Sequence, residues 1–362
     1  MKSAVKTFGI LTSGGDCPGL NAAIRGVAKA AWGIYGMNIA GISNGYKGLI
    51  ENDVRLMGPE DFSGILTRGG TILGTSREKP FGKLKESDFS VDEKLDAIRE
   101  TYRKNNLDCI VVLGGNGSHK TANLLREQGL NVIGLPKTID NDLYGTDITF
   151  GFHTAVDIAT EAIDRLHSTA HSHNRVMVIE VMGHNAGWLA LYSGLAGGGD
   201  VIILPEIPYR IDCIKDHLKN RAKSGKEFSI VVVAEGAISE EESKMDKKLL
   251  KQKRKDAFYP TKGYEVAKEI EESTGMDVRV SVLGYLQRGG APSPYDRVIA
   301  TQFGTAAAEL LHLGDFGKMV AKDGDRIVAK PLEEVAGKLK LVPKDHMLIR
   351  NGRMIGTCFG DE

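Results

Sequence analysis

The chain has 362 residues, 41% of them hydrophobic and 26% charged, which is typical of a compact globular protein. Basic and acidic residues both number 47, so no overall charge attracts nucleic acid or a membrane, and an anionic ligand needs a local basic cluster. The four cysteines are widely spaced without a CxxC motif, and no apolar run reaches transmembrane length; we expect a cytoplasmic protein with reduced thiols.

Short apolar runs rich in Val and Ile alternate with helical stretches along the whole chain. We expect strands at 8–13, 39–43, 109–113, 132–135, 176–181, 201–204, 230–235 and 279–283, and helices at 20–32, 91–104, 154–167 and 296–311. Strands of nearly continuous apolarity are typical of parallel sheets covered on both faces. The alternation predicts an α/β fold of two Rossmann-like, three-layer αβα domains with mostly parallel sheets, and an active site in the cleft between them.

The expected domains are discontinuous in sequence. The larger comprises residues 1–150 and about 288–335, and the smaller comprises 151–287 and about 336–362. The segment 239–262 interrupts the pattern, because the acidic residues at its start are followed by seven basic ones between residues 244 and 255. A charge run of this kind predicts a solvated, flexible insertion.

Three polar turns directly follow expected strands. The turns 12–21 (TSGGDCPGLN) and 114–118 (GGNGS) are glycine-rich, so backbone N–H groups can approach an anion closely. Neither is a GxGxxG or a Walker A motif. The third, 136–142 (PKTIDND), carries two carboxylates that can divide the work of a general base and a magnesium ligand. A tight βα turn and an Asx turn are the alternatives for single segments; together the three favour phosphoryl transfer to a hydroxyl.

Arginines near strand ends are further candidates. Arg77, Arg175, Arg279 and Arg288 lie beside or within glycine-containing loops or at expected strand termini. The planar guanidinium matches phosphate oxygens in a bidentate manner. Each one alone is more often part of a surface ion pair.

The segments LTSGGDCPGLNAAIRG, GGTILGTSR, LGGNGS, PKTIDND, TEAIDRLHSTAHSHNRVMVIEVMG and VSVLGYLQRGG occur in this order between residue 10 and about 290. Together they resemble the 6-phosphofructokinase family, which phosphorylates fructose 6-phosphate at its 1-hydroxyl. The charged insertion and the tail 356–360 are similar to the family's longer branch, which contains ATP-dependent and pyrophosphate-dependent enzymes.

The resemblance implies a role for each matching residue. Asp140 would deprotonate the sugar hydroxyl, with Thr138, Gly15 and Arg175 as the other catalytic residues. The larger domain would bind the phosphoryl donor and the smaller one the sugar phosphate. The sugar phosphate is expected on Thr138, Asp140, Asp142, Arg175, Met182, Gly183, His184, Glu235, Arg279, Tyr285 and Arg288. The donor is expected on Gly14, Gly15, Tyr46, Arg77, Gly115, Asn116, Gly117, Ser118 and Lys137, and Mg²⁺ at Asn116 and Asp142.

The resemblance also implies a homo-oligomer. In the family, the residues matching Arg175 and Arg279 reach into a neighbouring subunit's site, so a dimer or tetramer with shared active sites is expected. Three positions depart from the pattern. Asn116 replaces a usual acidic magnesium ligand, His184 replaces an arginine, and Tyr285 replaces a histidine of the short bacterial enzymes. These changes alter metal and substrate contacts and leave the proposed base unchanged.

Two positions bear on the donor, and they disagree. Pyrophosphate users typically have aspartate at the position of Gly117, where a carboxylate would repel a nucleotide's α-phosphate; glycine favours ATP. Lys137 matches the pyrophosphate users, although some longer ATP-dependent relatives combine glycine with lysine. We therefore expect ATP as donor, with a pyrophosphate-dependent phosphotransferase as the alternative.

Three other functions are weaker. A nicotinamide-dependent oxidoreductase needs GxGxxG followed by an acidic residue, and neither glycine turn supplies it. A zinc site at His167, His171 and His173 lacks an HExxH motif or cysteine partners. An inactive regulatory subunit is opposed by the intact Thr138, Asp140 and Asp142.

Overall fold

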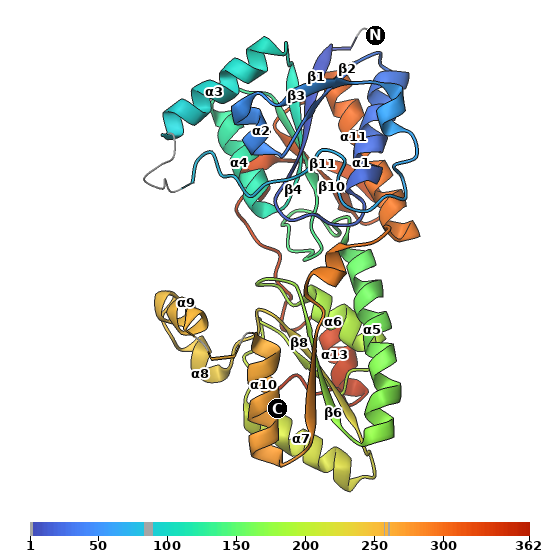
Figure 1. Ribbon diagram of the computed structural model, residues 1–362, viewed down its shortest axis with the longest axis vertical. Helices are drawn as coiled ribbons and strands as arrows, with labels where there is room; N and C mark the ends of the chain where they lie inside the picture. The colour runs from blue at the N-terminus through green and yellow to red at the C-terminus, as the bar shows by residue number, and fades with distance from the viewer. Residues whose placement is uncertain (1–2, 83–89, 257, 260) are drawn as a thin grey trace. The chain divides into compact units, whose positions relative to one another are not determined.

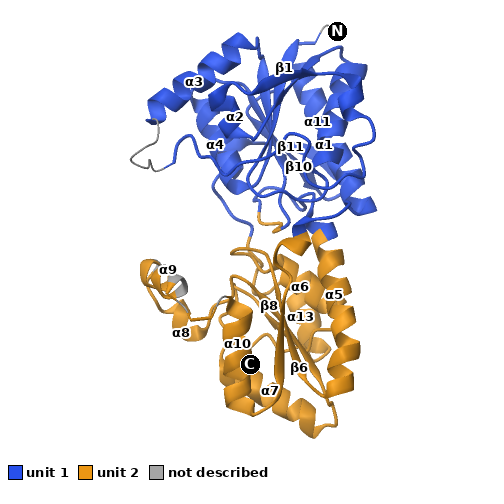
Figure 2. Ribbon diagram, in the orientation of Figure 1, with its two compact units in different colours: residues 1–139, 143–154, 288–340 blue, residues 140–142, 155–287, 341–362 orange. Residues whose placement is uncertain are grey.

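The computed structural model describes residues 3–82, 90–256, 258–259 and 261–362 (Figure 1). It divides into two compact units (Figure 2). Unit 1 comprises residues 1–139, 143–154 and 288–340, and unit 2 comprises 140–142, 155–287 and 341–362. The chain was expected to pass between the domains at residues 150, 288 and about 335, and in the structure it passes between the units at 154, 288 and 340. In addition, residues 140–142 group with unit 2.

Unit 1 contains a seven-stranded sheet in the order β11-β10-β5-β4-β1-β2-β3. The strands β2, β1, β4, β5 and β10 are parallel, and β3 and β11 are antiparallel edges. Their bounds are β1 Thr7–Ser13, β2 Asn38–Ile42, β3 Val54–Met57, β4 Cys109–Gly114, β5 Val132–Pro136, β10 Lys318–Asp323 and β11 Arg326–Pro331. The helices are α1 Leu20–Gly33, α2 Tyr46–Glu51, α3 Val91–Lys104, α4 Asn116–Glu127, α11 Pro294–Leu313 and α12 Leu332–Val335, with the 3₁₀ turn η1 Pro59–Phe62.

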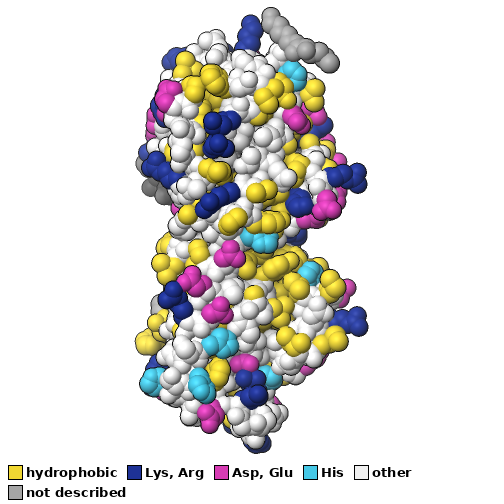
Figure 3. All heavy atoms as spheres, turned by 90° about the vertical axis from the view of Figure 1, so that its right-hand side faces the viewer, with side chains coloured by type: hydrophobic (Ala, Val, Ile, Leu, Met, Phe, Trp, Pro, Cys, Tyr) yellow, Lys and Arg dark blue, Asp and Glu magenta, His cyan; other side chains and the backbone are white. Residues whose placement is uncertain are grey.

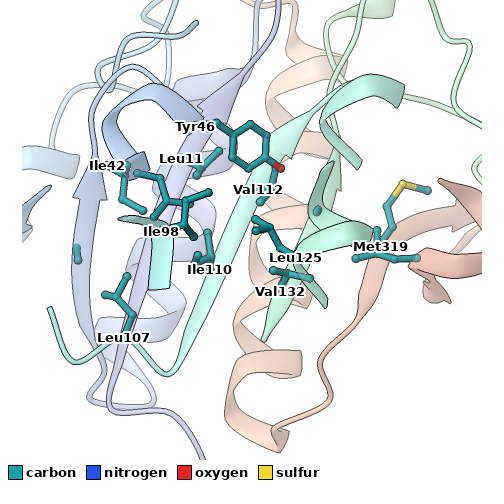
Figure 4. Close-up of a cluster of buried hydrophobic side chains, with 14 of the residues drawn as sticks. Leu11, Ile42, Tyr46, Ile98, Leu107, Ile110, Val112, Leu125, Val132 and Met319 are labelled. Atoms are coloured by element: carbon teal, nitrogen blue, oxygen red, sulfur yellow. The ribbon is translucent and has the colours of Figure 1, made fainter. Parts of the chain in front are cut away.

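Helices cover both faces of this sheet. On one face, strand side chains such as Leu11, Val112 and Val132 pack with Ile98 of α3 and Leu125 of α4 in a buried apolar cluster (Figure 4). On the other face α1 packs against α11. A Cβ on Gly26 of α1 would lie 2.9 Å from the carbonyl oxygen of Thr301, so only glycine allows this close approach of the two helices.

Unit 2 contains four parallel strands in the order β7-β8-β6-β9. They are β6 Val176–Val181, β7 Val201–Ile203, β8 Ser229–Ala234 and β9 Val278–Val282. The helices are α5 Phe152–His173, α6 Trp188–Ala196, α7 Ile211–Lys223, α8 Glu240–Ser243, α9 Lys247–Lys255, α10 Lys262–Thr274 and α13 Met347–Met354, with the 3₁₀ turn η2 Gly284–Arg288. Helices α7 and α10 cover one face of the strands, and α5, α6 and α13 the other (Figure 1).

The predicted α/β class with mostly parallel sheets is confirmed, and each of the eight predicted strands is present. The prediction missed β3, β10 and β11. These strands carry exposed or half-exposed charged residues such as Arg55, Lys318 and Lys330 within short apolar runs. Strands at or next to a sheet edge need not be apolar on both faces, so they lack the continuous pattern used to find the others.

The prediction of a wholly solvated insertion at 239–262 is wrong at both ends of that segment. Glu242 of α8 is 1% exposed and Lys262 of α10 is 7% exposed, and their charged groups lie 2.8 Å apart. Ser239 and Glu242 form a capping box at the start of α8. Of the three glutamates at the start of the segment, Glu242 is therefore buried, because the residue that ends the segment supplies the opposite charge.

Basic and acidic side chains are interspersed on the surface shown in Figure 3, as the balanced composition leads one to expect. None of the helices in the part of the chain that the structure describes is long and apolar enough to span a membrane.

Candidate active site

The three turns identified in the sequence follow three neighbouring strands of unit 1. β1, β4 and β5 are adjacent and parallel, and the register aligns Ser13 with Gly114 and Gly114 with Pro136. The strands therefore end at the same level, and all three turns begin at one edge of the sheet. The carboxyl edge of a parallel sheet is where α/β proteins bind ligands.

The first turn is held by the loop that precedes Arg77. The N–H of Gly14 donates to the carbonyl of Ser76 (3.0 Å), and the hydroxyl of Thr75 donates to the carbonyl of Gly14 (2.7 Å). Gly14 has a φ of 88°, a conformation that favours glycine. The exposed Arg77 directly follows Ser76, so these bonds hold it close to the first turn.

The second turn forms the beginning of a helix rather than a free loop. α4 starts at Asn116 without a side-chain N-cap and without an acidic residue in its first turn, so its free N–H groups favour an anion. A Cβ on Gly117 would have no atom within 4 Å, so the space beside this exposed residue is open. The side-chain oxygen of Asn116 accepts from the N–H of Gly337 (2.8 Å).

The third turn is tied to the other two through Lys137, which is 3% exposed. Its ammonium group donates to the carbonyl of Gly15, and its backbone N–H donates to the carbonyl of Gly114 (3.0 Å). Thr138 is buried, and its carbonyl accepts from the hydroxyl of Thr149 (2.7 Å). Beyond it, Asp140 is half-buried and Asp142 is 8% exposed.

Arg288 lies on the first turn, although the resemblance placed it among the sugar-phosphate residues. Its guanidinium donates to the carbonyl of Asp16 (3.0 Å) and packs so closely on Gly15 that a Cβ there would collide with it. The side chain therefore brings a positive charge to the glycine turn.

Tyr46 occupies a supporting position in the same unit. It is 1% exposed, and its hydroxyl donates to the carbonyl of Ser118 (2.8 Å). Ser118 in turn donates its hydroxyl to the carbonyl of Ser13 (3.3 Å). Both side chains hold backbone of the turns in place.

A second set of expected residues follows the strands of unit 2. Met182, Gly183 and His184 follow β6, Glu235 follows β8, and Tyr285 lies in η2 after β9. The register aligns Val181 with Ala234 and Glu180 with Val282, so these residues share the carboxyl edge. The N–H of His184 donates to the carboxylate of Glu235 (2.7 Å), which joins two of the loops.

Arg175 and Arg279 are not brought to that edge. Arg175 directly precedes β6 and Arg279 is the second residue of β9, so both lie at the amino edge of the unit 2 sheet. Both guanidinium groups pair with Asp277. With about 3.3 Å per residue, a six-residue strand separates the two edges by roughly 16–20 Å.

Asp296 is a supporting residue that the sequence reasoning treated only as a helix start. It is fully buried and accepts from the N–H of Gly151 (3.0 Å) and of Thr154 (2.7 Å). Burial raises its pKa more than these bonds lower it. Its position in Ser293-Pro-Tyr-Asp is a helix-start signal, and the sequence holds no sign of its second role.

Glycine turns and a helix N-terminus at aligned strand ends, followed by a loop with two carboxylates, define an α/β protein built to hold phosphate groups. Comparison with known proteins is more specific: the family model for phosphofructokinase matches residues 7–311. The chain belongs to the phosphofructokinase family.

Two relatives match over nearly their whole length. The chain is 70% identical to the ATP-dependent 6-phosphofructokinase of Spirochaeta thermophila, over 99% of both chains. It is 54% identical to ATP-dependent 6-phosphofructokinase 3 of Bacteroides thetaiotaomicron, over 98% of this chain and 99% of the other. Among solved structures, the T-state of Pichia pastoris phosphofructokinase has a TM-score of 0.79 at 34% identity, over 92% of this chain and 35% of that one.

Proposed function

We propose that this protein is an ATP-dependent 6-phosphofructokinase, which transfers the γ-phosphoryl group of ATP to the 1-hydroxyl of fructose 6-phosphate. The observation that carries the proposal is the alignment of the three turns at one sheet edge, with the PKTIDND loop last among them. The relatives described above support the choice of ATP and of this sugar phosphate.

The chemistry assigned to this chain's residues is a direct displacement. The carboxylate of Asp140 takes the proton of the 1-hydroxyl, the resulting oxygen attacks the γ-phosphorus, and the bond to the leaving ADP oxygen breaks. Thr138 holds the sugar beside this base. The donor's negative charge is neutralised by the N–H groups at the start of α4 and by the guanidinium groups of Arg77 and Arg288. Most of the rate enhancement comes from positioning.

We propose that Mg²⁺ accompanies the nucleotide. It prefers oxygen ligands and is usually bound by one or two carboxylates together with substrate phosphates. Asp142 can supply one such oxygen, whereas the Asn116 amide oxygen already accepts from Gly337. The donor set fits an ion that arrives with the nucleotide, and bound Mg²⁺ would neutralise charge on the phosphates.

The environment of two residues favours ATP over pyrophosphate. Space beside Gly117 is open, which suits a nucleotide that extends beyond its β-phosphate. Lys137 is buried, and its ammonium group donates to the carbonyl of Gly15. A structural role therefore explains why a lysine occupies this position. The pyrophosphate-dependent reaction remains the second candidate because of the lysine itself.

The sugar phosphate is assigned to the carboxyl edge of unit 2 and to arginines from a second subunit. Glu235, with the loop of Met182, Gly183 and His184, offers hydrogen-bond partners for sugar hydroxyls. Because Arg175 and Arg279 lie at the opposite edge of the same sheet, they fit the 6-phosphate of a neighbouring subunit, in a dimer or tetramer.

The widely spaced thiols support a cytoplasmic location.

The first test compares initial rates with fructose 6-phosphate and Mg²⁺, using ATP or pyrophosphate as donor. We expect strong turnover with ATP alone. Asp140→Asn should lower kcat at least about a hundredfold while binding of fructose 6-phosphate stays near wild type. Asp147→Asn, an exposed carboxylate seven residues on, is the control. Near-normal turnover of Asp140→Asn would contradict the mechanism, and turnover with pyrophosphate would reverse the donor assignment.

A further inference from the structure

A buried histidine lies beneath the second turn. His119 is in the first turn of α4 and is 1% exposed. Its Nδ1 lies 3.0 Å from the carbonyl oxygen of Gly115, the N-cap residue of that helix, and the backbone N–H of His119 donates to the same oxygen (3.0 Å). A carbonyl can only accept, so Nδ1 carries the proton and donates it to Gly115.

The other side of the imidazole packs on the neighbouring strand β5. A Cβ on Gly134 would lie 2.5 Å from Cδ2 and 2.6 Å from Nε2 of His119, so only glycine leaves room for the ring. In the described part of the chain, Nε2 has no hydrogen-bond partner. Burial, opposed by the bond to Gly115 and reinforced by the charge of Lys137, lowers the pKa of His119 to about 4. The ring is therefore neutral near pH 7.

His119 completes a pattern in which carbonyls of the turns are bonded by side chains from the same unit. Tyr46 bonds the carbonyl of Ser118, Lys137 that of Gly15, and His119 that of Gly115. In a trans peptide the C=O and the N–H point in opposite directions. Holding the Gly115 carbonyl toward His119 therefore aims the N–H of Asn116 away from the imidazole.

We propose that His119 is a positioning residue for the phosphoryl donor: its imidazole adds a second bond to the Gly115 carbonyl and so fixes the peptide between Gly115 and Asn116, with the first N–H of α4 facing the donor's phosphates. The inference rests on the proposed function, since that function places a nucleotide at this turn. Gly134 serves the same purpose from β5 by leaving space for the ring.

The test compares two replacements of the histidine. His119→Phe fills a similar volume without a donor, and His119→Asn keeps an N–H near the position of Nδ1. We expect His119→Phe to raise KM for MgATP about three- to tenfold, the amount typical of one lost hydrogen bond, with kcat and KM for fructose 6-phosphate within about twofold of wild type. His119→Asn should recover most of the loss.

A second variant reaches the same ring from the strand. Gly134→Ala should raise KM for MgATP in the same direction, because its methyl group displaces the imidazole. His312→Phe, which removes a half-buried imidazole stacked on Tyr35 in the same unit, is the control and should leave KM for MgATP unchanged.

Direct calorimetric binding of MgATP separates this inference from the proposed function. A wild-type protein that binds ATP but does not phosphorylate fructose 6-phosphate would overturn the function, and a weaker affinity of His119→Phe would still support the inference. Equal ATP affinities and equal KM values for wild type, His119→Phe and Gly134→Ala would overturn the inference.

Discussion

In the proposed function, the side chain at position 117 decides whether a nucleotide fits beside the start of α4. It does not have a positive φ, and a Cβ there would touch nothing, so both alanine and aspartate are compatible with the backbone. We predict that Gly117→Asp raises KM for MgATP at least about tenfold, because it adds a negative charge beside the phosphates without disturbing the fold. A carboxylate in the first turn of α4 even favours the helix.

The matched control is Gly117→Ala, which adds a methyl group without charge. Steady-state kinetics at constant Mg²⁺ should show KM close to wild type for alanine and a large increase for aspartate. If the two variants had the same KM, charge at this position would not govern donor binding.

Cys17 lies inside the first turn, and its environment makes it unreactive. It is fully buried, and burial, partly offset by the charge of Lys137, raises the pKa of its thiol to about 12. The thiolate is the reactive form, so very little is available near pH 8. We predict that iodoacetamide labels the half-buried Cys213 before Cys17, as read by peptide mass spectrometry. Labelling of Cys17 at the rate of Cys213 in the native protein would contradict this.

The ion pair between Glu242 of α8 and Lys262 of α10 joins the two ends of the charged insertion 239–262. Burial raises the pKa of Glu242, but the bonds from Lys262, Ser239 and Lys253 outweigh it and hold the pKa below its ordinary value. A carboxyl group with a lowered folded-state pKa contributes stability above its unfolded pKa of about 4.3 and loses it as the pH falls through the folded value.

We therefore predict that Glu242→Gln destabilises unit 2 by about 2 kcal/mol at pH 7, because the buried Lys262 loses one of two partner carboxylates and retains that of Glu265 (2.8 Å). The difference from wild type should shrink as the pH falls from about 4.3 through the lower folded-state pKa, because the wild-type carboxylate then takes up a proton. Thermal unfolding followed across pH measures both effects, with the exposed neighbour Glu241→Gln as control. An unchanged melting temperature at pH 7 would show that the ion pair between Glu242 and Lys262 does not contribute to the stability of unit 2.

The elements that the sequence predicts well are those whose local pattern is complete. Strands such as β4 and β6 are covered on both faces and are continuously apolar. The turns that follow them are recognised by their glycines and carboxylates. The adjacency of β1, β4 and β5 depends on topology, which no single segment encodes, so the meeting of their turns had to come from the structure.

The roles of individual side chains were less accessible to sequence reasoning. The contact of Lys137 with Gly15 and that of Arg288 with Asp16 join residues more than 100 positions apart, and lysine or arginine in a loop carries no signal of its partner. The position of Arg175 was predictable from the sequence, because a residue that directly precedes the predicted strand 176–181 must lie at the amino edge of the sheet.

For the whole molecule, this edge position makes the assembly testable. If each active site combines Asp140 of one subunit with Arg175 of another, two inactive variants should complement each other. In a hybrid of Asp140→Asn and Arg175→Ala, one site has both defects and the other has none. Random mixing into two-fold dimers makes half of them hybrids, so we predict about a quarter of wild-type activity.

The experiment co-refolds or co-expresses the two variants and measures the activity of the mixture. Hybrids isolated by two different affinity tags should reach about half of wild-type activity, because one of their two sites is intact. Each variant alone should be at least about a hundredfold slower than wild type if both residues serve the reaction. Arg165→Ala, an exposed arginine of α5 that pairs with Glu161, replaces Arg175→Ala in the control mixture and should itself be active. Hybrids that contain both chains but recover no activity would place Arg175 outside the partner's site, and an active Arg175→Ala alone would remove it from the reaction.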